Sequence, residues 1–211
     1  MFSLFKKSSP SILYTDKVWK RSEYALKGML MMAMLRLQQG KPCLLAYFFE
    51  SDGERLAGFM QENKLDFVRL DELSIPDSAN ASLFLVNAKE LSKASITNFL
   101  KQNSSQFSGE ALFSGHYPIS SIEHNALQSL SIAGFDKFVF CISFDDPLLR
   151  LFNSQNIVPL LEKLGLAEEE AIEHAMVTKS IQRAREKVES KVTREVQAKS
   201  SEEWFAINLK K

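Results

Sequence analysis

FVFCISF, at residues 138–144, is the most strand-like stretch of the sequence. A continuous apolar run of this length is typical of a strand that is buried on both faces of a sheet. Asp145, Asp146 and Pro147 follow it and predict a capped helix start, because proline in the first turn of a helix forfeits no hydrogen bond. The segment therefore predicts a buried parallel strand that leads directly into a helix.

The sequence before this stretch alternates between strand-like and helix-like segments. Strands are predicted at 43–49, 65–70, 83–86 and 111–113, and helices at 18–39, 51–63, 92–102 and 120–133. Parallel strands need long crossover connections, so the alternation predicts an α/β fold with a parallel sheet covered by helices. We expect a lead-in at residues 1–17, one α/β domain at 18–153 and a helical extension at 154–211.

The extension ends in a long amphipathic segment. Residues 168–199 contain no proline or glycine and predict one long helix. Its apolar positions form a stripe, made of Ile172, Met176, Ile181, Ala184, Val188, Val192 and Val196. Trp204 and Phe205 follow this stripe. Because apolar surface of this extent needs a cover, these nine residues either fold back on the sheet, pair with a second copy in a homodimer, or bind a protein partner.

Composition excludes several classes of function. Lys plus Arg number 26 and Asp plus Glu number 26, so a net charge near zero argues against a nucleic-acid or polybasic membrane binder. No apolar stretch reaches the ~18 residues of a membrane span. The N-terminus lacks the order of charges that a secretory signal has. Cys43 and Cys141 both lie in apolar runs, as reduced core cysteines do. We therefore expect a cytoplasmic protein.

No pattern of metal-binding or catalytic residues is found. His116, His124 and His174 are far apart in the sequence, and neither cysteine has CxxC spacing, so no metal and no cofactor are expected. The pair Asp145–Asp146 is interpreted as the cap of the next helix rather than as a catalytic carboxylate pair.

Three motifs in the extension point to a known family. LLEKLGL at 160–166, AIEH at 171–174 and MVTKSI at 176–181 closely resemble the bacterial preprotein translocase ATPase SecA, where its second motor domain passes into the helical scaffold. Residues 138–152 resemble the last motor strand of that family and the acidic turn after it. Residues 18–70 share its general outline. The resemblance implies a RecA-like fold and a role in protein export, with the Sec translocase or a preprotein as partner.

The middle of the chain departs from the family in the motifs that act on ATP. Asn87 is the one residue that resembles a relic of the glycine-rich motif, and Asn87 and Lys89 are weak candidates for nucleotide binding. The sequence has no arginine between Arg69 and Arg150 and no G-x-x-x-x-G-K-[S/T] loop. The resemblance therefore implies a pseudo-ATPase without catalytic residues that acts by protein binding. Two alternatives stay open: half of a split ATPase completed by a separate P-loop chain, or a SecA-derived domain that works outside secretion.

Overall fold

A computed structural model describes residues 12–71, 75, 83–151, 158–163 and 165–209. Within them lies one six-stranded sheet with the strand order β1-β6-β5-β2-β4-β3. All five neighbouring pairs are parallel. The strands are β1 (Thr15–Trp19), β2 (Cys43–Tyr47), β3 (Phe67–Leu70), β4 (Leu83–Asn87), β5 (Glu110–Ser114) and β6 (Lys137–Ser143). The parallel α/β architecture expected from the alternating pattern is confirmed.

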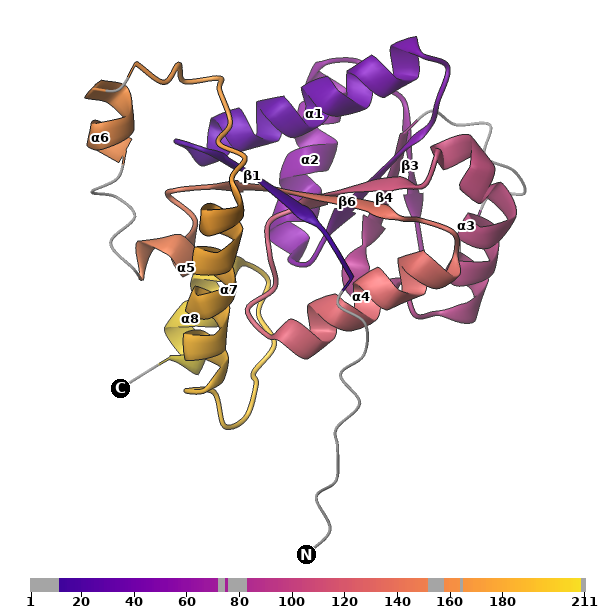
Figure 1. The fold of residues 1–211 in the computed structure, drawn as a ribbon. Coiled ribbons are helices and arrows are strands. Elements are labelled where there is room, and N and C mark those ends of the chain that lie inside the picture. The colour runs from indigo at the N-terminus through magenta and orange to yellow at the C-terminus, as the bar shows by residue number, and fades with distance from the viewer. Residues whose placement is uncertain (1–11, 72–74, 76–82, 152–157, 164, 210–211) are drawn as a thin grey trace, which may run out of the picture.

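Helices cover both faces of this sheet (Figure 1). They are α1 (Ser22–Gln38), α2 (Glu50–Glu62), the 3₁₀ turn η1 (Ala88–Glu90), α3 (Ala94–Phe107), α4 (Ser120–Ile132), α5 (Pro147–Arg150), α6 (Val158–Lys163), α7 (Ala175–Glu189) and α8 (Ser201–Asn208). Helices α1 and α2 share one apolar cluster with the sheet, whereas α3, α4, α7 and α8 share the other. None of the helices in the described ranges is long and apolar enough to cross a membrane.

The centre of the sheet is buried and rich in phenylalanine. All five residues of β2 are buried, as its continuous apolar run predicted. On the face that α3 and α4 cover, the Phe113 ring stacks on Phe140 at 4.7 Å between centroids, and Phe84 meets Phe107 edge-on at 5.3 Å. Aromatic pairs at these spacings add to the free energy gained from burying their area. Cys43 and Cys141 are buried free thiols in the other cluster.

The connections after β2 and β5 leave the sheet in opposite directions. After β2 the chain passes through α2, on one face, to β3. After β5 it passes through α4, on the opposite face, to β6. In open α/β sheets this arrangement opens a crevice at the carboxyl ends of the two strands, where ligands usually bind. The fold thus provides a crevice of the kind in which ligands bind, at the carboxyl ends of β2 and β5.

The N-terminal part of the chain differs from the prediction. A helix was expected from residue 18, but residues Thr15–Trp19 form the edge strand β1 and α1 begins only at Ser22. Strand β1 pairs with β6, the most strand-like stretch of the chain, from Thr15 opposite Val139 to Trp19 opposite Ser143. This pairing joins segments that are far apart in sequence, which local periodicity cannot indicate.

The single helix expected at 168–199 is also wrong. Ile172 instead forms an antiparallel bridge with Val18 of β1, through two backbone hydrogen bonds of 2.9 and 3.0 Å. His174 then caps α7, because its Nδ1 accepts the backbone N–H of Met176 at 3.1 Å. Helix α7 ends at Glu189, and the chain turns back before α8 begins at Ser201. The helical extension therefore exists, but it is bent around one end of the sheet.

Candidate functional site

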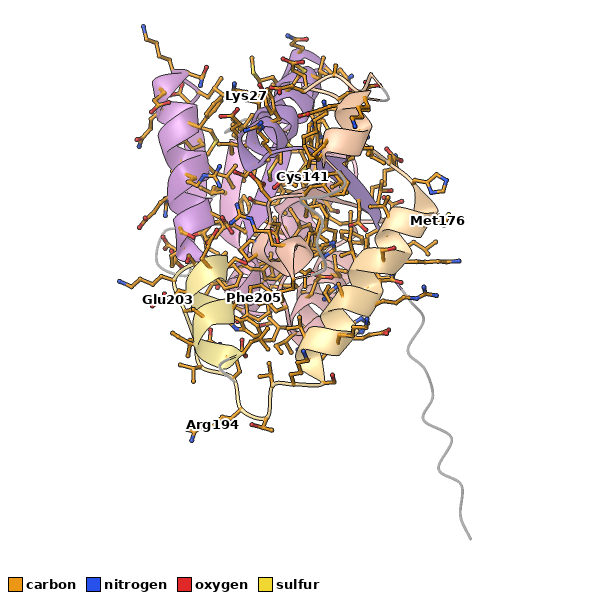
Figure 2. All side chains as sticks on the ribbon, turned by 90° about the vertical axis from the view of Figure 1, so that its left-hand side faces the viewer. Lys27, Cys141, Met176, Arg194, Glu203 and Phe205 are labelled. Carbon is orange, nitrogen blue, oxygen red and sulfur yellow. The ribbon has the colours of Figure 1, made fainter. Side chains whose placement is uncertain are left out.

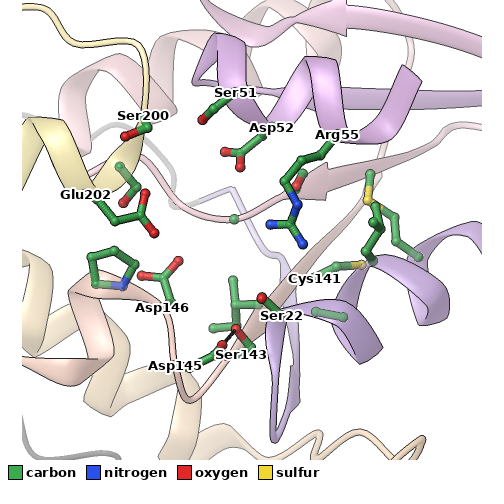
Figure 3. Close-up of a pocket in the computed structure, with 18 of the residues that line it drawn as sticks. Ser22, Ser51, Asp52, Arg55, Cys141, Ser143, Asp145, Asp146, Ser200 and Glu202 are labelled. Carbon is green, nitrogen blue, oxygen red and sulfur yellow. Dashed lines mark hydrogen bonds between the residues drawn. The ribbon is translucent and has the colours of Figure 1, made fainter. Parts of the chain in front are cut away.

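A cavity of about 220 Å³ lies at the crevice between the carboxyl ends of β2 and β5. Its walls come from the ends of β5 and β6 and the residues just after them, and from the N-terminal parts of α1, α2, α5 and α8. Figure 3 shows that Asp52, Asp146 and Glu202 point toward one another across it, and that the Arg55 guanidinium enters from α2. Gly115 lies on its floor, where Asp146 Oδ2 is 4.0 Å from the position that a Cβ atom would take.

The cavity is acidic. Four carboxylates line it, those of Asp52, Asp145, Asp146 and Glu202, against two guanidinium groups, Arg55 and Arg150. Burial raises the pKa of Asp52 to about 7, and nearby Asp146 raises it further, while Arg55 lowers it. Burial also raises the pKa of Asp146 to about 6, although its bond with the Leu148 backbone opposes this. The raised pKa of Asp52 leaves this side chain partly protonated at neutral pH, but the four carboxyl groups still outnumber the two guanidinium groups, so the cavity is a poor site for phosphate groups.

Both aspartates after β6 have local structural partners. Asp146 caps α5, because its Oδ1 accepts the backbone N–H of Leu148 at 2.8 Å, which confirms the capping role predicted for the pair in the case of Asp146. Asp145 accepts a hydrogen bond from the Ser143 hydroxyl. Arg55 and Arg150 belong to the cavity although the sequence reasoning did not place them there. Asp52 and Glu202 were likewise missed, because only the folded chain brings α2 and α8 together.

The nucleotide-binding candidates Asn87 and Lys89 lie at the end of β4, outside the cavity lining. Asn87 Oδ1 accepts the backbone N–H of Lys89 at 3.0 Å, and its Nδ2 donates to Glu50 at 2.9 Å. Lys89 Nζ donates to Gln197 Oε1 at 2.9 Å and sits 4.6 Å above the Tyr117 ring. Burial lowers the pKa of Lys89, and Glu195 and Glu50 partly offset this. Both candidates thus contact other parts of the chain.

The residues predicted to bind a partner divide into three groups. Most belong to this chain's own core, where they are buried: Ile181, Ala184, Val188, Trp204 and Phe205. Ile172 and Val192 are partly buried against that core. Met176 and Val196 are exposed, at 70% and 49%, and Figure 2 shows Met176 on the outer side of α7. The stripe therefore folds back on the domain, while binding of a partner by these residues stays a prediction.

A network of buried charged groups was missed by the sequence reasoning. His116, in the segment after β5, contacts Asp16 of β1 and Glu123 of α4, both at 2.8 Å. Glu123 also binds Arg185 of α7 at 2.6 Å, and Arg185 Nε donates to the Tyr117 carbonyl at 3.1 Å. We call these four side chains the buried charge network. It connects the sheet edge, α4 and the helical extension.

The charges of the network shift one another's protonation. Burial by itself would lower the pKa of His116, but Glu123 and Asp16 together raise it to about 9. Burial would raise the pKa of Glu123, yet His116 and Arg185 outweigh it and lower that pKa. His116 also stacks on Phe140, with ring centroids 4.1 Å apart. The site therefore favours the protonated, imidazolium form of His116, as expected where two acidic and two basic side chains are buried together. The described residues contain no group that could hold a metal ion.

Comparison with known proteins finds a local similarity. Protein translocase subunit SecA of Acidithiobacillus ferrooxidans is 56% identical over 52 residues, which is 25% of this chain and 6% of that protein. SecA of Chlorobium phaeobacteroides is 51% identical over 51 residues, 24% of this chain and 5% of that protein. SecA of Thermus thermophilus is 48% identical over 52 residues, 25% of this chain and 5% of that protein.

The chain therefore contains a SecA-like region, as the motifs in the extension indicated. The similarity spans only a small part of the length of these relatives. The sequence matches no family model. Among solved structures, the C-terminal part of the Fun30 ATPase domain has a TM-score of 0.42 and 10% identity, and the alignment covers 75% of this chain and 51% of that one.

Proposed function

We propose that this chain is a non-catalytic SecA-like protein that acts by binding another protein in the process of protein export. In this proposal the domain expected at residues 18–153, which the fold extends to include all of β1 from Thr15, is a degenerate RecA-like motor domain, and residues 154–211 are a scaffold-like extension. The Sec translocase or a preprotein is the proposed partner, and the cytoplasm the proposed location. The SecA-like region supports the link to export, because it resembles the joint between motor and scaffold.

The observation that carries the proposal is the charge of the cavity at the carboxyl ends of β2 and β5. A nucleotide bound there would bring its phosphates beside Asp52, Asp146 and Glu202, with only Arg55 and Arg150 to offset them. Enzymes that transfer phosphoryl groups do the opposite: they gather backbone N–H groups, lysine, arginine and a metal ion around the phosphates. The absence of a Walker A loop from this sequence agrees with that reading.

An ATPase assay on the purified full chain, with and without translocase components, tests the lack of catalysis. We expect no turnover by the chain alone and no upward shift of its melting temperature with Mg-ATP, since a ligand stabilises only a protein that binds it. Turnover at motor-like rates would overturn the proposal. The variant Arg55→Ala is the control: if weak turnover appears and this variant loses it, the activity belongs to the chain and not to a contaminant.

A pull-down from the cells that make the protein tests the binding role. Recovery of translocase subunits or unfolded preproteins supports it. Copurification of a P-loop protein whose ATPase activity depends on this chain would instead favour a split ATPase. Recovery of partners unrelated to secretion would show that the SecA-derived domain works elsewhere.

A further inference from the structure

The last part of the chain lies across the carboxyl end of the sheet. We call residues 191–209, which include α8, the C-terminal strap. Its two aromatic side chains are the best-buried part: Trp204 is 0% exposed and packs edge-on against Tyr117, with ring centroids 6.3 Å apart. Phe205 lies next to Trp204, with centroids 5.1 Å apart. The strap is therefore seated on an aromatic surface that belongs to the sheet domain.

The strap also accepts hydrogen bonds from donor groups on that surface. The Tyr117 hydroxyl donates to the Glu195 carboxylate, which also accepts the Trp204 indole N–H at 2.8 Å. Lys89 Nζ donates to Gln197 at 2.9 Å. The backbone N–H of Ser51, in the first turn of α2, donates to the Lys199 carbonyl at 3.0 Å.

The receiving surface is built from residues that follow strands β2, β4 and β5. Tyr117 stacks against Phe49 at 5.2 Å and tilts against Phe48 at 5.5 Å. Lys89 spans the Tyr117 and Phe49 rings, at 4.6 and 5.5 Å from their centroids. We call Phe49, Ser51, Lys89 and Tyr117 the strap-binding surface. Aromatic rings, a cation and a backbone N–H donor are groups that can hold the apolar side chains, carboxylates and carbonyls of a bound segment.

The strap also forms hydrogen bonds within itself. Asn208 accepts the Val196 backbone N–H at 2.7 Å and donates to the Val196 carbonyl at 2.9 Å. Ser200 caps α8 by accepting the Glu203 N–H at 3.1 Å. A unit that is already ordered loses little conformational entropy when it binds. These internal hydrogen bonds therefore lower the entropy cost of seating the strap on the surface.

We infer that the strap-binding surface is a peptide-binding surface that the chain's own C-terminal strap occupies. In place of the strap, this surface binds a partner segment that presents a carboxylate beside an indole ring. The seated strap defines this chemistry, through Glu195 and Trp204. While the strap is bound, the surface is autoinhibited, and a partner must displace it. The inference deepens the proposed binding function by assigning its surface, and it rests on that function.

A synthetic, fluorescein-labelled peptide with the sequence of residues 191–209 is the probe. The full chain should bind it weakly, because its own strap competes at a high effective concentration. The full-length variant Glu195→Ala/Gln197→Ala, whose strap has lost its side-chain hydrogen bonds with Tyr117 and Lys89, should bind the probe at least about tenfold more tightly. Fluorescence anisotropy measures this difference. The exposed Arg194→Ala strap variant is the matched control and should behave as the unchanged chain does.

Two further measurements make the inference falsifiable. First, a probe peptide with Glu195→Ala and Trp204→Ala should bind neither the unchanged chain nor the Glu195→Ala/Gln197→Ala chain. Second, the full-length Trp204→Ala chain, checked for folding by circular dichroism, should bind the original probe as tightly as the Glu195→Ala/Gln197→Ala chain does. Equal weak binding by all chains would overturn the inference. A concentration-dependent dimer of the double variant would show that the occupant is the strap of a second copy, which overturns the assigned partner. ATP turnover is scored separately, so a failed titration is distinct from a failed proposal of non-catalysis.

Discussion

At the residue scale, His116 carries the clearest consequence. Its ring lies between two acidic side chains from different elements, Asp16 and Glu123, and stacks on Phe140. Asp16 uses only one of its oxygens: Oδ2 is buried with no hydrogen-bond partner among the described residues. The network therefore depends on the proton that His116 holds, because its loss would leave two buried carboxylates facing a neutral ring.

We expect the stability of the protein to fall at alkaline pH through His116. Its pKa is raised from 6.5 to about 9 in the folded chain, so the stabilisation is fully present below pH 6.5 and is lost as the pH rises through 9. Asp52 and Asp146, with pKa values raised to about 7 and 6, change the stability mainly below pH 8. Burial also raises the pKa of the Cys43 and Cys141 thiols, which lowers the stability over the same alkaline range. The contribution of the histidine is therefore obtained by urea unfolding between pH 8 and 10 of the unchanged chain and of a variant without it.

The variant His116→Asn provides the comparison for this measurement. Asparagine has no charge to lose, so its stability should be lower than that of the unchanged chain at pH 7 and should vary less between pH 8 and 10. The difference between the two chains should shrink by an amount on the order of 1 kcal/mol across that range. Parallel curves for both chains would show that another group causes the loss.

At the element scale, Gly28 allows α1 to pack closely against Trp19 of β1. A Cβ atom at Gly28 of α1 would lie 2.2 Å from the Trp19 ring, whereas one at Gly58 of α2 would meet nothing within 4 Å. The Trp19 indole also donates to the Glu169 carbonyl at 3.0 Å, which limits its freedom to move aside. Glycine at position 28 is thus required by packing and not by backbone conformation.

Gly28→Ala should therefore destabilise the chain although alanine favours a helix. We expect a loss of about 1–3 kcal/mol in the free energy of unfolding, the usual result of overpacking. The matched substitution Gly58→Ala, also within a helix, should stabilise by up to ~1 kcal/mol. Chemical unfolding of both variants measures this contrast. Equal effects of the same sign would mean that α1 can move away from β1 without cost.

At the scale of the whole molecule, the helical extension and the sheet are one structure. Helix α7 contributes Ile181, Ala184 and Val188 to the apolar cluster that contains β2, β5 and β6. The buried charge network adds a polar connection, because Arg185 of α7 reaches Glu123 of α4. The extension was interpreted as a long helix that needs a cover, and in the folded chain the domain itself covers most of its stripe.

Arg185→Met should test this connection. The substitution retains the apolar volume but leaves Glu123 buried without its arginine, which we expect to cost about 3–5 kcal/mol. The exposed neighbour Arg183→Met should change the stability by less than about 0.5 kcal/mol. Because extension and sheet share one core, unfolding of the unchanged chain should remain a single transition by circular dichroism and by tryptophan fluorescence, to which Trp19 of β1 and Trp204 of α8 both contribute. Two separate transitions would contradict a shared core.

Much of the fold follows from local patterns. The buried strands β2, β4 and β6, the helices between them and the cap at Asp146 were predicted because hydrophobic periodicity and capping act over a few residues. Strand β1 was not, because its polar and apolar residues alternate as weakly as those of a loop and its pairing with β6 spans more than a hundred positions. The long helix was predicted wrongly for the same reason: the backbone of Ile172 pairs with Val18 instead of continuing a helix.

The sequence alone determined that this chain forms a parallel α/β sheet, that it contains a SecA-like region and that it lacks a Walker A loop. These properties reside in short segments, where residue spacing decides the local structure. Only the tertiary structure decided that Asp52, Asp146 and Glu202 share one acidic cavity, that His116 is enclosed by two carboxylates and that the C-terminal strap covers Tyr117 and Lys89. Each of these joins residues that are distant in the chain, because the charge and burial of a site come from all the elements that meet there.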